Sequence, residues 1–472
     1  MNPIVTLLAL AAMALPAALP AAALRPDQVR FLDIYRELVE TNTELSDGSC
    51  TLAADKMAAR LKAAGFPESD LHRFSVPDHP REGGLVAVLP ARGATLKPIL
   101  LLAHIDVVEA KRSDWARDPF KLIEEDGYFY ARGASDDKAM AASWVDTLIR
   151  LKQAGHPLIR TVKMALTCGE ETEGAFNGAQ WLAANQRDLV DAEFALNEGG
   201  AGQLDAQGKR LYLGTEAEEK TRQDYVLTAT DAGGHSSLPG TENAIYRVSD
   251  ALARIERYSF PVRLDSVSRA FFTSIAKLVG GADALAIEAL LRDPADQAAL
   301  RIITANPMWN AVLHTTCVPT EIAGGHATNA LPQRVTANIN CRLLPGERQE
   351  EVLAKLASLI HDPKVSITMP NTIGASARTV PLDETVMGPI RTVAARYYPG
   401  VPVVATLVSG STDGVFFGNA GIPTYGVPSF FYDADYGHIH GLNERIRTSS
   451  VYEGRDFLYD LVALYVAKDG LR

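Results

Sequence analysis

Cysteine is scarce in this chain, and its scarcity excludes two kinds of protein. Only 4 of the 472 residues are cysteines, which is too few for a disulfide-rich scaffold. No pair has Cys-x-x-Cys spacing, so a thiolate metal site is not expected. Cys317 and Cys341 lie symmetrically about a predicted hairpin near Asn329, so a cross-strand disulfide between them is one hypothesis. Four free cysteines are the alternative.

Positive charge and long apolar runs are also lacking. The formal net charge is -11, which argues against nucleic acid as a partner. After residue 23 no segment is long and apolar enough to cross a membrane, so no stable membrane association is expected.

The N-terminus is the exception, because residues 4–19 form an apolar, alanine-rich run. Pro20-Ala21-Ala22-Ala23 then supplies small residues, and residues 1–23 together resemble a secretory signal peptide. No Lys or Arg precedes the run, and an uncleaved membrane anchor is the alternative. Because the run is short and contains Pro16, we expect cleavage and an exported protein, periplasmic or secreted.

The length favours two or three domains, and the first half of the chain alternates between helical and strand patterns. Such alternation is typical of an α/β fold with a mostly parallel sheet. Helices are predicted over residues 26–40, 50–64, 139–154 and 178–185, and strands over 84–89, 99–103, 162–166 and 194–197.

The pattern changes near residue 222. Strands that alternate in polarity (224–230, 334–343, 365–369) and helices (243–257, 348–361) predict a smaller α+β domain. A long insertion at about 262–315 contains helical patches such as 282–292. After residue 372 the alternation typical of an α/β fold resumes, with a predicted helix at 384–397 and predicted strands at 401–407 and 423–427. We therefore expect a catalytic domain in two parts, 24–221 and 372–472, interrupted by a lid domain at 222–371.

Polar and acidic side chains follow the predicted strands of the first domain. His104 and Asp106 end one strand and share a face, Glu170 and Glu171 follow the next, and Glu198 closes the one after. Each could be an ordinary polar strand end or a solvated turn. Because parallel strands end at one edge of a sheet, however, these groups should converge, and uncompensated carboxylates would repel each other there.

Further candidates lie in two loops. Asp136 belongs to the turn Arg132-Gly133-Ala134-Ser135-Asp136-Asp137-Lys138, where N-capping of the next helix is the competing explanation. His438 and His440 lie far downstream in Gly437-His438-Ile439-His440-Gly441-Leu442-Asn443-Glu444, and either could be a surface histidine. Two histidines with four or five carboxylates suit a dinuclear zinc site.

These motifs, in this order, resemble the zinc hydrolase family of aminoacylase, glutamate carboxypeptidase and succinyl-diaminopimelate desuccinylase. The resemblance rests on His-x-Asp, Arg-Gly-x-x-Asp-Asp-Lys, Gly-Glu-Glu, Asn-Glu-Gly-Gly and a late His-x-x-Asn-Glu. It covers nearly the whole chain after the leader and implies an inserted lid or dimerisation domain. Two stretches resemble the carboxypeptidase and aminoacylase branch of this family more than its deacetylases and desuccinylases: Asn197-Glu198-Gly199-Gly200 and the segment from Asp114-Trp115 to Phe120.

The resemblance also implies a role for each site residue. His104 and Glu198 would bind one zinc ion, Glu171 and His440 the other, and Asp136 would bridge them. Cobalt or manganese could replace zinc. Asp106 would orient His104, and Glu170 would be the general base. The Asp136–Asp137 peptide bond would be cis, and His440 is preferred over His438 because only His440 has Asn443-Glu444 at the matching offset.

Substrate-binding residues are implied in the lid domain and in one late loop. His235, in Gly233-Gly234-His235-Ser236-Ser237, would stabilise the oxyanion, often from a partner subunit, although a simple glycine turn also explains the motif. Asn329 and Arg342 would contact the substrate. Ser409, Gly410 and Ser411 resemble a loop near the substrate carboxylate, and this loop lacks the Gly-x-Ser-x-Gly of a serine hydrolase.

These expectations describe a zinc-dependent peptidase or amidohydrolase that acts on small substrates with a free carboxylate. The partner is a small peptide or an N-acyl amino acid, so an aminoacylase-like activity is the alternative to an exopeptidase. A non-catalytic metal-binding relative would have lost Glu170 or a ligand, and none is missing. A homodimer could form through the lid domain, and the insertion could either block or build that interface.

Overall fold

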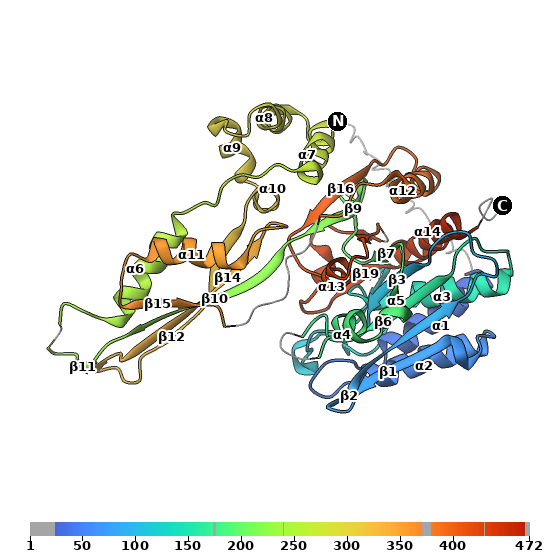
Figure 1. Ribbon diagram of the computed structural model, residues 1–472, viewed down its shortest axis with the longest axis horizontal. Helices are drawn as coiled ribbons and strands as arrows, with labels where there is room; N and C mark the ends of the chain where they lie inside the picture. Colours follow the sequence, from blue (N-terminus) through green and yellow to red (C-terminus); the bar gives the residue numbers. More distant parts are fainter. Residues whose placement is uncertain (1–23, 173–175, 239, 371–378, 429, 468–472) are drawn as a thin grey trace, which may run out of the picture.

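The computed structural model describes residues 24–172, 176–238, 240–370, 379–428 and 430–467, which form two lobes (Figure 1). The predicted signal peptide, residues 1–23, lies outside the described residues, as does the expected return to the catalytic domain at residue 372. Among the described residues, no helix combines the length and apolarity that a membrane span requires.

The larger lobe is built on a ten-stranded sheet with a parallel centre, as predicted. Its strand order is β1-β2-β6-β3-β7-β17-β9-β8-β18, and β16 pairs with β9 off this path. β6, β3, β7 and β17 are parallel neighbours. The strands are β1 Leu71–Val76, β2 His79–Leu89, β3 Ile99–His104, β6 Val162–Thr167, β7 Phe194–Asn197, β8 Gly202–Leu204, β9 Arg210–Glu219, β16 Val403–Val408, β17 Thr424–Gly426 and β18 Phe431–Tyr432.

Helices cover both faces of this sheet, which explains why β3 and β6 are buried along their whole length. Ile99 and Leu101 of β3 face one core, whereas Leu100 and Leu102 face the other. The first core is closed by α1 Pro26–Val39, α2 Cys50–Ala63, α3 Lys138–Ala154, α12 Glu384–Tyr397 and α14 Thr448–Val466. The second lies under α4 Gly178–Asn185, α5 Arg187–Val190 and α13 Gly414–Asn419.

A small three-stranded sheet joins two loops that are far apart in the sequence. Its order is β19-β5-β4, and Arg445 of β19 lies opposite Tyr130 of β5. The loop that follows β5 therefore lies beside the loop that precedes β19. The strands are β4 Ile123–Glu125, β5 Tyr128–Tyr130 and β19 Arg445–Arg447, and the short 3-10 helices of this lobe are η1 Glu68–Asp70, η2 Arg112–Asp114 and η3 Tyr436–His438.

The smaller lobe is an antiparallel sheet of order β12-β14-β10-β15, with α6 and α11 packed on its buried face. Residues of β10 alternate between buried and half-buried, as expected for a sheet covered on one side. Its elements are β10 Thr221–Thr230, β12 Thr316–Gly324, β14 Arg334–Leu343, β15 Val365–Thr368, α6 Ala244–Glu256 and α11 Gln349–Ile360. A two-stranded ribbon, β11 Gly234–His235 with β13 Ala330–Leu331, lies at the far end (Figure 1).

The predicted disulfide of this lobe is confirmed. Cys317 of β12 lies directly opposite Cys341 of β14, and their sulfur atoms are bonded. The close approach of the two backbones, with the Cα atoms 4.0 Å apart, resembles that of a non-hydrogen-bonded antiparallel pair.

The insertion folds into four helices: α7 Ser266–Val279, α8 Gly281–Arg292, α9 Gln297–Thr304 and α10 Pro307–Leu313. They share a core of their own, which Val404 of β16 and Tyr212 of β9 complete. Although the insertion lies within the lid domain in the sequence, it packs in space against the strands of the larger lobe (Figure 1).

Candidate metal centre

Three strand ends of the larger lobe bring the first group of predicted residues together. β3 ends at His104, which lies beside Thr167 of β6, and Glu170 and Glu171 follow β6. Glu198 directly follows β7, the other neighbour of β3. The convergence expected from a parallel sheet therefore occurs at this edge.

Asp136 lies between the two histidines. Its Oδ1 atom is 3.1 Å from Nε2 of His104, and its Oδ2 atom is 3.2 Å from Nε2 of His440. Glu198 Oε1 lies 3.6 Å from His104 Nε2, and Glu171 Oε2 lies 3.0 Å from His440 Nε2. The five predicted ligands thus form two groups, each with one histidine and one glutamate, that share the Asp136 carboxylate.

The donor set fits divalent cations. Ligand atoms of His104, Asp136 and Glu171 lie within 4.8 Å of one another, and so do those of His104, Asp137 and Glu198. Asp137 was not among the predicted ligands. Its Oδ2 atom is buried and accepts no hydrogen bond from the described residues. Imidazole and carboxylate donors in such numbers suit zinc, and cations would offset the repulsion among the acids.

The charges of the centre perturb one another strongly. Burial raises the pKa of Glu170 and of Glu198 well above the usual range of a carboxyl group. Hydrogen bonds to Asp136 and Glu171 raise the pKa of His440 to about 10. Burial lowers the pKa of His104, but the Glu198, Asp106 and Asp136 carboxylates outweigh it and the net shift is upward. All four side chains therefore favour the addition of a positive charge, either a proton or a metal cation.

His438 lies outside this group. Its Nε2 atom is 3.2 Å from Asp435, and its Nδ1 atom faces the carbonyl oxygen of Leu442. The structure therefore places His440, and not His438, beside the carboxylates.

Asp106 contacts both the histidine and the glutamate loop. Nδ1 of His104 is 3.1 Å from the main-chain oxygen of Asp106 and 3.6 Å from its carboxylate. The carboxylate itself accepts the backbone N–H of Glu171 at 2.9 Å and that of Glu170 at 3.4 Å. Its main contact is thus with the turn that aims the two glutamates.

Glu444 is a central residue of the site for which the sequence motifs predicted no role. It is fully buried, and its carboxylate accepts hydrogen bonds from the Arg132 guanidinium and from the backbone N–H groups of Gly133, Ser135 and Asp136. It joins the Asp136 loop to the His440 loop. The Asn-Glu pair in the late motif was the signal for it. The Asp136–Asp137 peptide bond is cis, as the resemblance implied.

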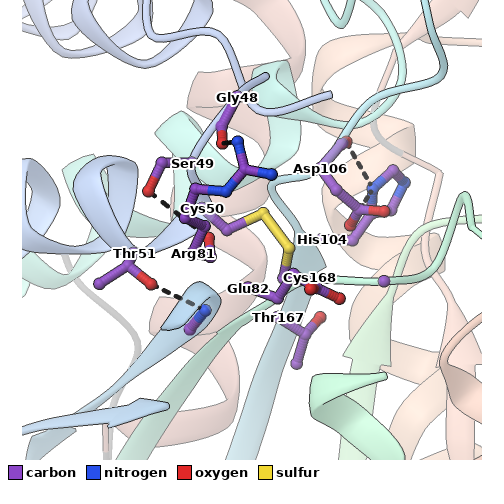
Figure 2. Close-up of a disulfide and its surroundings, with 12 residues drawn as sticks. Gly48, Ser49, Cys50, Thr51, Arg81, Glu82, His104, Asp106, Thr167 and Cys168 are labelled. Atoms are coloured by element: carbon purple, nitrogen blue, oxygen red, sulfur yellow. Dashed lines mark hydrogen bonds and ion pairs between the residues drawn. A yellow bond between two sulfur atoms is a disulfide. The ribbon is translucent and has the colours of Figure 1, made fainter. Parts of the chain in front are cut away.

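A second disulfide, which the sequence pattern did not indicate, lies beside the centre. Figure 2 shows that Cys50, the first residue of α2, is bonded to Cys168, and that His104 and Asp106 lie nearby. Gly169 follows with a φ of +96°, and a Cβ atom there would overlap the carbonyl oxygen of Phe176. The turn into Glu170 is therefore held by the disulfide and by this close backbone approach.

The loop after β16 approaches the centre through buried polar contacts. Asp413 accepts hydrogen bonds from Thr167 at 2.6 Å and from Asn177 at 2.8 Å. Burial raises the pKa of Asp413 to about 6. Of the predicted residues Ser409, Gly410 and Ser411, Ser409 lines a cavity that also contacts Asp136 and Glu198.

The three predicted residues of the smaller lobe are not brought to the centre. His235 is exposed in the distal ribbon, where its Nδ1 atom accepts a hydrogen bond from the backbone of Ser237, and Asn329 lies beside it. Arg342 lies on β14 opposite Arg222, near the point where the chain enters the lobe. Their roles in binding or catalysis stay predictions.

Comparison with known proteins identifies a family and relatives that match most of this chain. Residues 100–464 match the model of peptidase family M20/M25/M40. The N-fatty-acyl-amino acid synthase/hydrolase PM20D1 of Homo sapiens is 27% identical over 78% of this chain and 74% of its own length. The probable carboxypeptidase S-like 2 of Dictyostelium discoideum is 26% identical over 78% of this chain and 72% of its own.

Solved structures share the fold. The M20 family metallo-carboxypeptidase Sso-CP2 from Sulfolobus solfataricus aligns over 92% of this chain and 99% of its own, with a TM-score of 0.70 and 19% identity. The YXEP protein of Bacillus subtilis, a dinuclear metal binding peptidase from the M20 family, aligns over 92% and 97%, with a TM-score of 0.58 and 14% identity.

Proposed function

The chain belongs to peptidase family M20/M25/M40, a family of metallopeptidase hydrolases, and we propose that it cleaves an amide bond in small substrates with a free carboxylate, using two zinc ions. The observation that carries this proposal is the shared Asp136 carboxylate, with one oxygen toward His104 and the other toward His440. Glu198 would complete the first metal position and Glu171 the second. Cations in these positions would supply Lewis acidity, which acidifies water and polarises a carbonyl group.

Glu170 is the proton acceptor in this proposal. Because burial raises the pKa of its carboxyl group, the carboxylate is a stronger base than an exposed glutamate. It takes a proton from the attacking water and delivers it to the nitrogen of the leaving group. Glu171, one residue further, has its carboxylate beside His440 and is committed to metal binding.

A metal assay with matched variants tests the ligand assignment. Purified protein should hold about two metal ions per chain, as the paired donor groups predict. His440→Ala should lose part of the metal, whereas His438→Ala, a control on the same loop, should retain it. Full metal occupancy in the His440 variant would refute the assignment.

Glu170→Gln tests the mechanism separately. The variant should bind metal normally but lose about 10²- to 10⁴-fold in turnover, because only the proton transfer is removed. Near-normal turnover with peptides or N-acyl amino acids, read as amine release, would refute the role of Glu170.

An N-acyl amino acid hydrolase is the second candidate activity. The relatives named N-fatty-acyl-amino acid synthase/hydrolase and carboxypeptidase S-like match similar shares of this chain, so they support both candidates. A hydrolysis screen of dipeptides against N-acyl amino acids decides between them.

Export and dimerisation complete the proposal. Two disulfides favour an oxidising compartment, and removal of residues 1–23 would leave Leu24 as the first residue of the mature protein. N-terminal sequencing of the exported protein tests this. A homodimer through the smaller lobe would let His235 of one subunit approach the centre of another, and light scattering tests the oligomeric state.

A further inference from the structure

A cavity of about 310 Å³ lies next to the proposed metal centre, with Asp136 and Glu198 in its wall. Its volume is at the lower end of the range for small-molecule sites, about 300–1,000 Å³. Another part of the wall comes from the insertion, through Phe271 of α7 and Met308 and Val312 of α10. The cavity therefore runs from the metal ligands to a segment that plays no part in holding them.

The wall formed by the insertion is held in place by the larger lobe. Phe272 and Leu313, the neighbours of two lining residues, are fully buried in the core that the inserted helices share with Val404 of β16. Phe271 and Val312 are themselves 3% and 4% exposed, so their side chains have little room to move. Met308 is 44% exposed, which places it at the mouth.

The charge of the cavity decides which part of a substrate can enter. Among the described residues that line it, none is Lys or Arg, and the charged ones are the acids Asp136, Asp137 and Glu198. The proposed cations would take up the charge of these acids, and along the rest of the described lining a substrate carboxylate would find no counter-ion. An uncharged hydrocarbon group would instead have its own surface removed from water against Phe271 and Val312.

We infer that α7 and α10 form a specificity pocket for the acyl side of the scissile amide, and that its ligand is an apolar acyl chain longer than acetyl. The inference rests on the proposed amide hydrolysis at the adjacent centre. The free carboxylate of the substrate lies on the other side of the bond. The insertion thus sets substrate choice without contributing to the chemistry.

Chain length is the first test of this pocket. In a series of N-acyl leucines from acetyl to octanoyl, kcat/KM should rise about 3- to 4-fold for each added CH2 until the cavity is full, as the transfer of CH2 groups from water predicts. If every member is hydrolysed at equal kcat/KM, the inferred acyl-chain pocket is refuted but the proposed function is not. Hydrolysis of no peptide or N-acyl amino acid at all would overturn the proposed function.

A matched pair of variants is the second test. Met308→Glu places a carboxylate at the mouth and should lower the octanoyl-to-acetyl ratio of kcat/KM about 10-fold or more. Leu285→Glu, on α8 of the same insertion, is 68% exposed and does not line the cavity, so it should leave that ratio unchanged. Equal ratios in the two variants would overturn the inference. So would a Met308→Glu effect that depends on the amino acid rather than on the acyl group.

Discussion

Replacing Glu444 with Gln should lower the free energy of unfolding by about 3–5 kcal/mol, because it leaves a buried guanidinium without its counter-ion. The side chains of Arg132 and Glu444 are only 3% and 1% exposed, and Arg132 Nη1 lies 2.7 Å from Glu444 Oε2. Arg132 also donates hydrogen bonds to the carbonyl oxygens of His440 and Gly441. Its side chain therefore cannot rotate toward solvent without losing these bonds to the loop.

The magnitude follows from the contacts that the substitution keeps and loses. The oxygen of the new amide could still accept the backbone N–H groups of Ser135 and Asp136, which lie 2.8 and 3.2 Å from Oε1 of Glu444. The other oxygen becomes an NH2 group, which would face the donors of Arg132 and Gly133. Buried donors left without acceptors cost about 1–3 kcal/mol each, consistent with the total expected from the broken ion pair.

Urea unfolding followed by tryptophan fluorescence measures this loss, because the Trp115 ring lies 5.1 Å from the Arg132 guanidinium carbon. The double variant Arg132→Met/Glu444→Gln removes the unpaired charge and should recover part of the stability. Glu68→Gln, at an exposed ion pair with Lys62, is the control and should show no measurable change. A Glu444→Gln variant within about 1 kcal/mol of the parent would refute the reasoning.

The remaining predictions concern the disulfides and a buried acid. Removing Cys50–Cys168 by serine substitution should cost about 1.4 kcal/mol more unfolding free energy than removing Cys317–Cys341, because the cysteines are 118 and 24 residues apart. Equal losses in urea unfolding would contradict the loop-entropy argument. Burial raises the pKa of Glu219 from 4.5 to about 7, so its contribution to stability is present below pH 4.5 and lost as the pH rises toward 7. In the Glu219→Gln variant the free energy of unfolding should therefore change less with pH than in the parent, by up to about 3 kcal/mol between pH 4.5 and 7. The same pH dependence in variant and parent would contradict the raised pKa of Glu219.

The part of the site that the sequence could predict is the part set by strand ends. His104, Glu171 and Glu198 end or follow apolar runs that the sequence predicts to be buried strands of a parallel sheet, and such strands place their ends together. Asp136 and His440 come from loops, and no periodicity placed them. They were found because the motif order resembles a known family.

The residues that the sequence could not assign depend on tertiary contacts. Glu216 and Glu219 lie in an acidic stretch of β9 that resembles a solvated surface, yet the structure buries both. Cys50 and Cys168 are 118 residues apart with no local pattern to pair them. The helices of the insertion have apolar faces, but such a face does not reveal which sheet it will cover.

One device recurs around the proposed metal centre: a carboxylate from another part of the chain accepts backbone N–H groups of a loop that carries site residues. Asp106 holds the turn of Glu170 and Glu171 in this way, and Glu444 holds the loop of Asp136. Glu219 does the same for the backbone N–H of Thr412. Since these bonds are made to the backbone and not to the ligand side chains, they would persist when metal is removed. The loops are therefore organised before metal binds, and loss of metal should cost activity without loss of the loop structure.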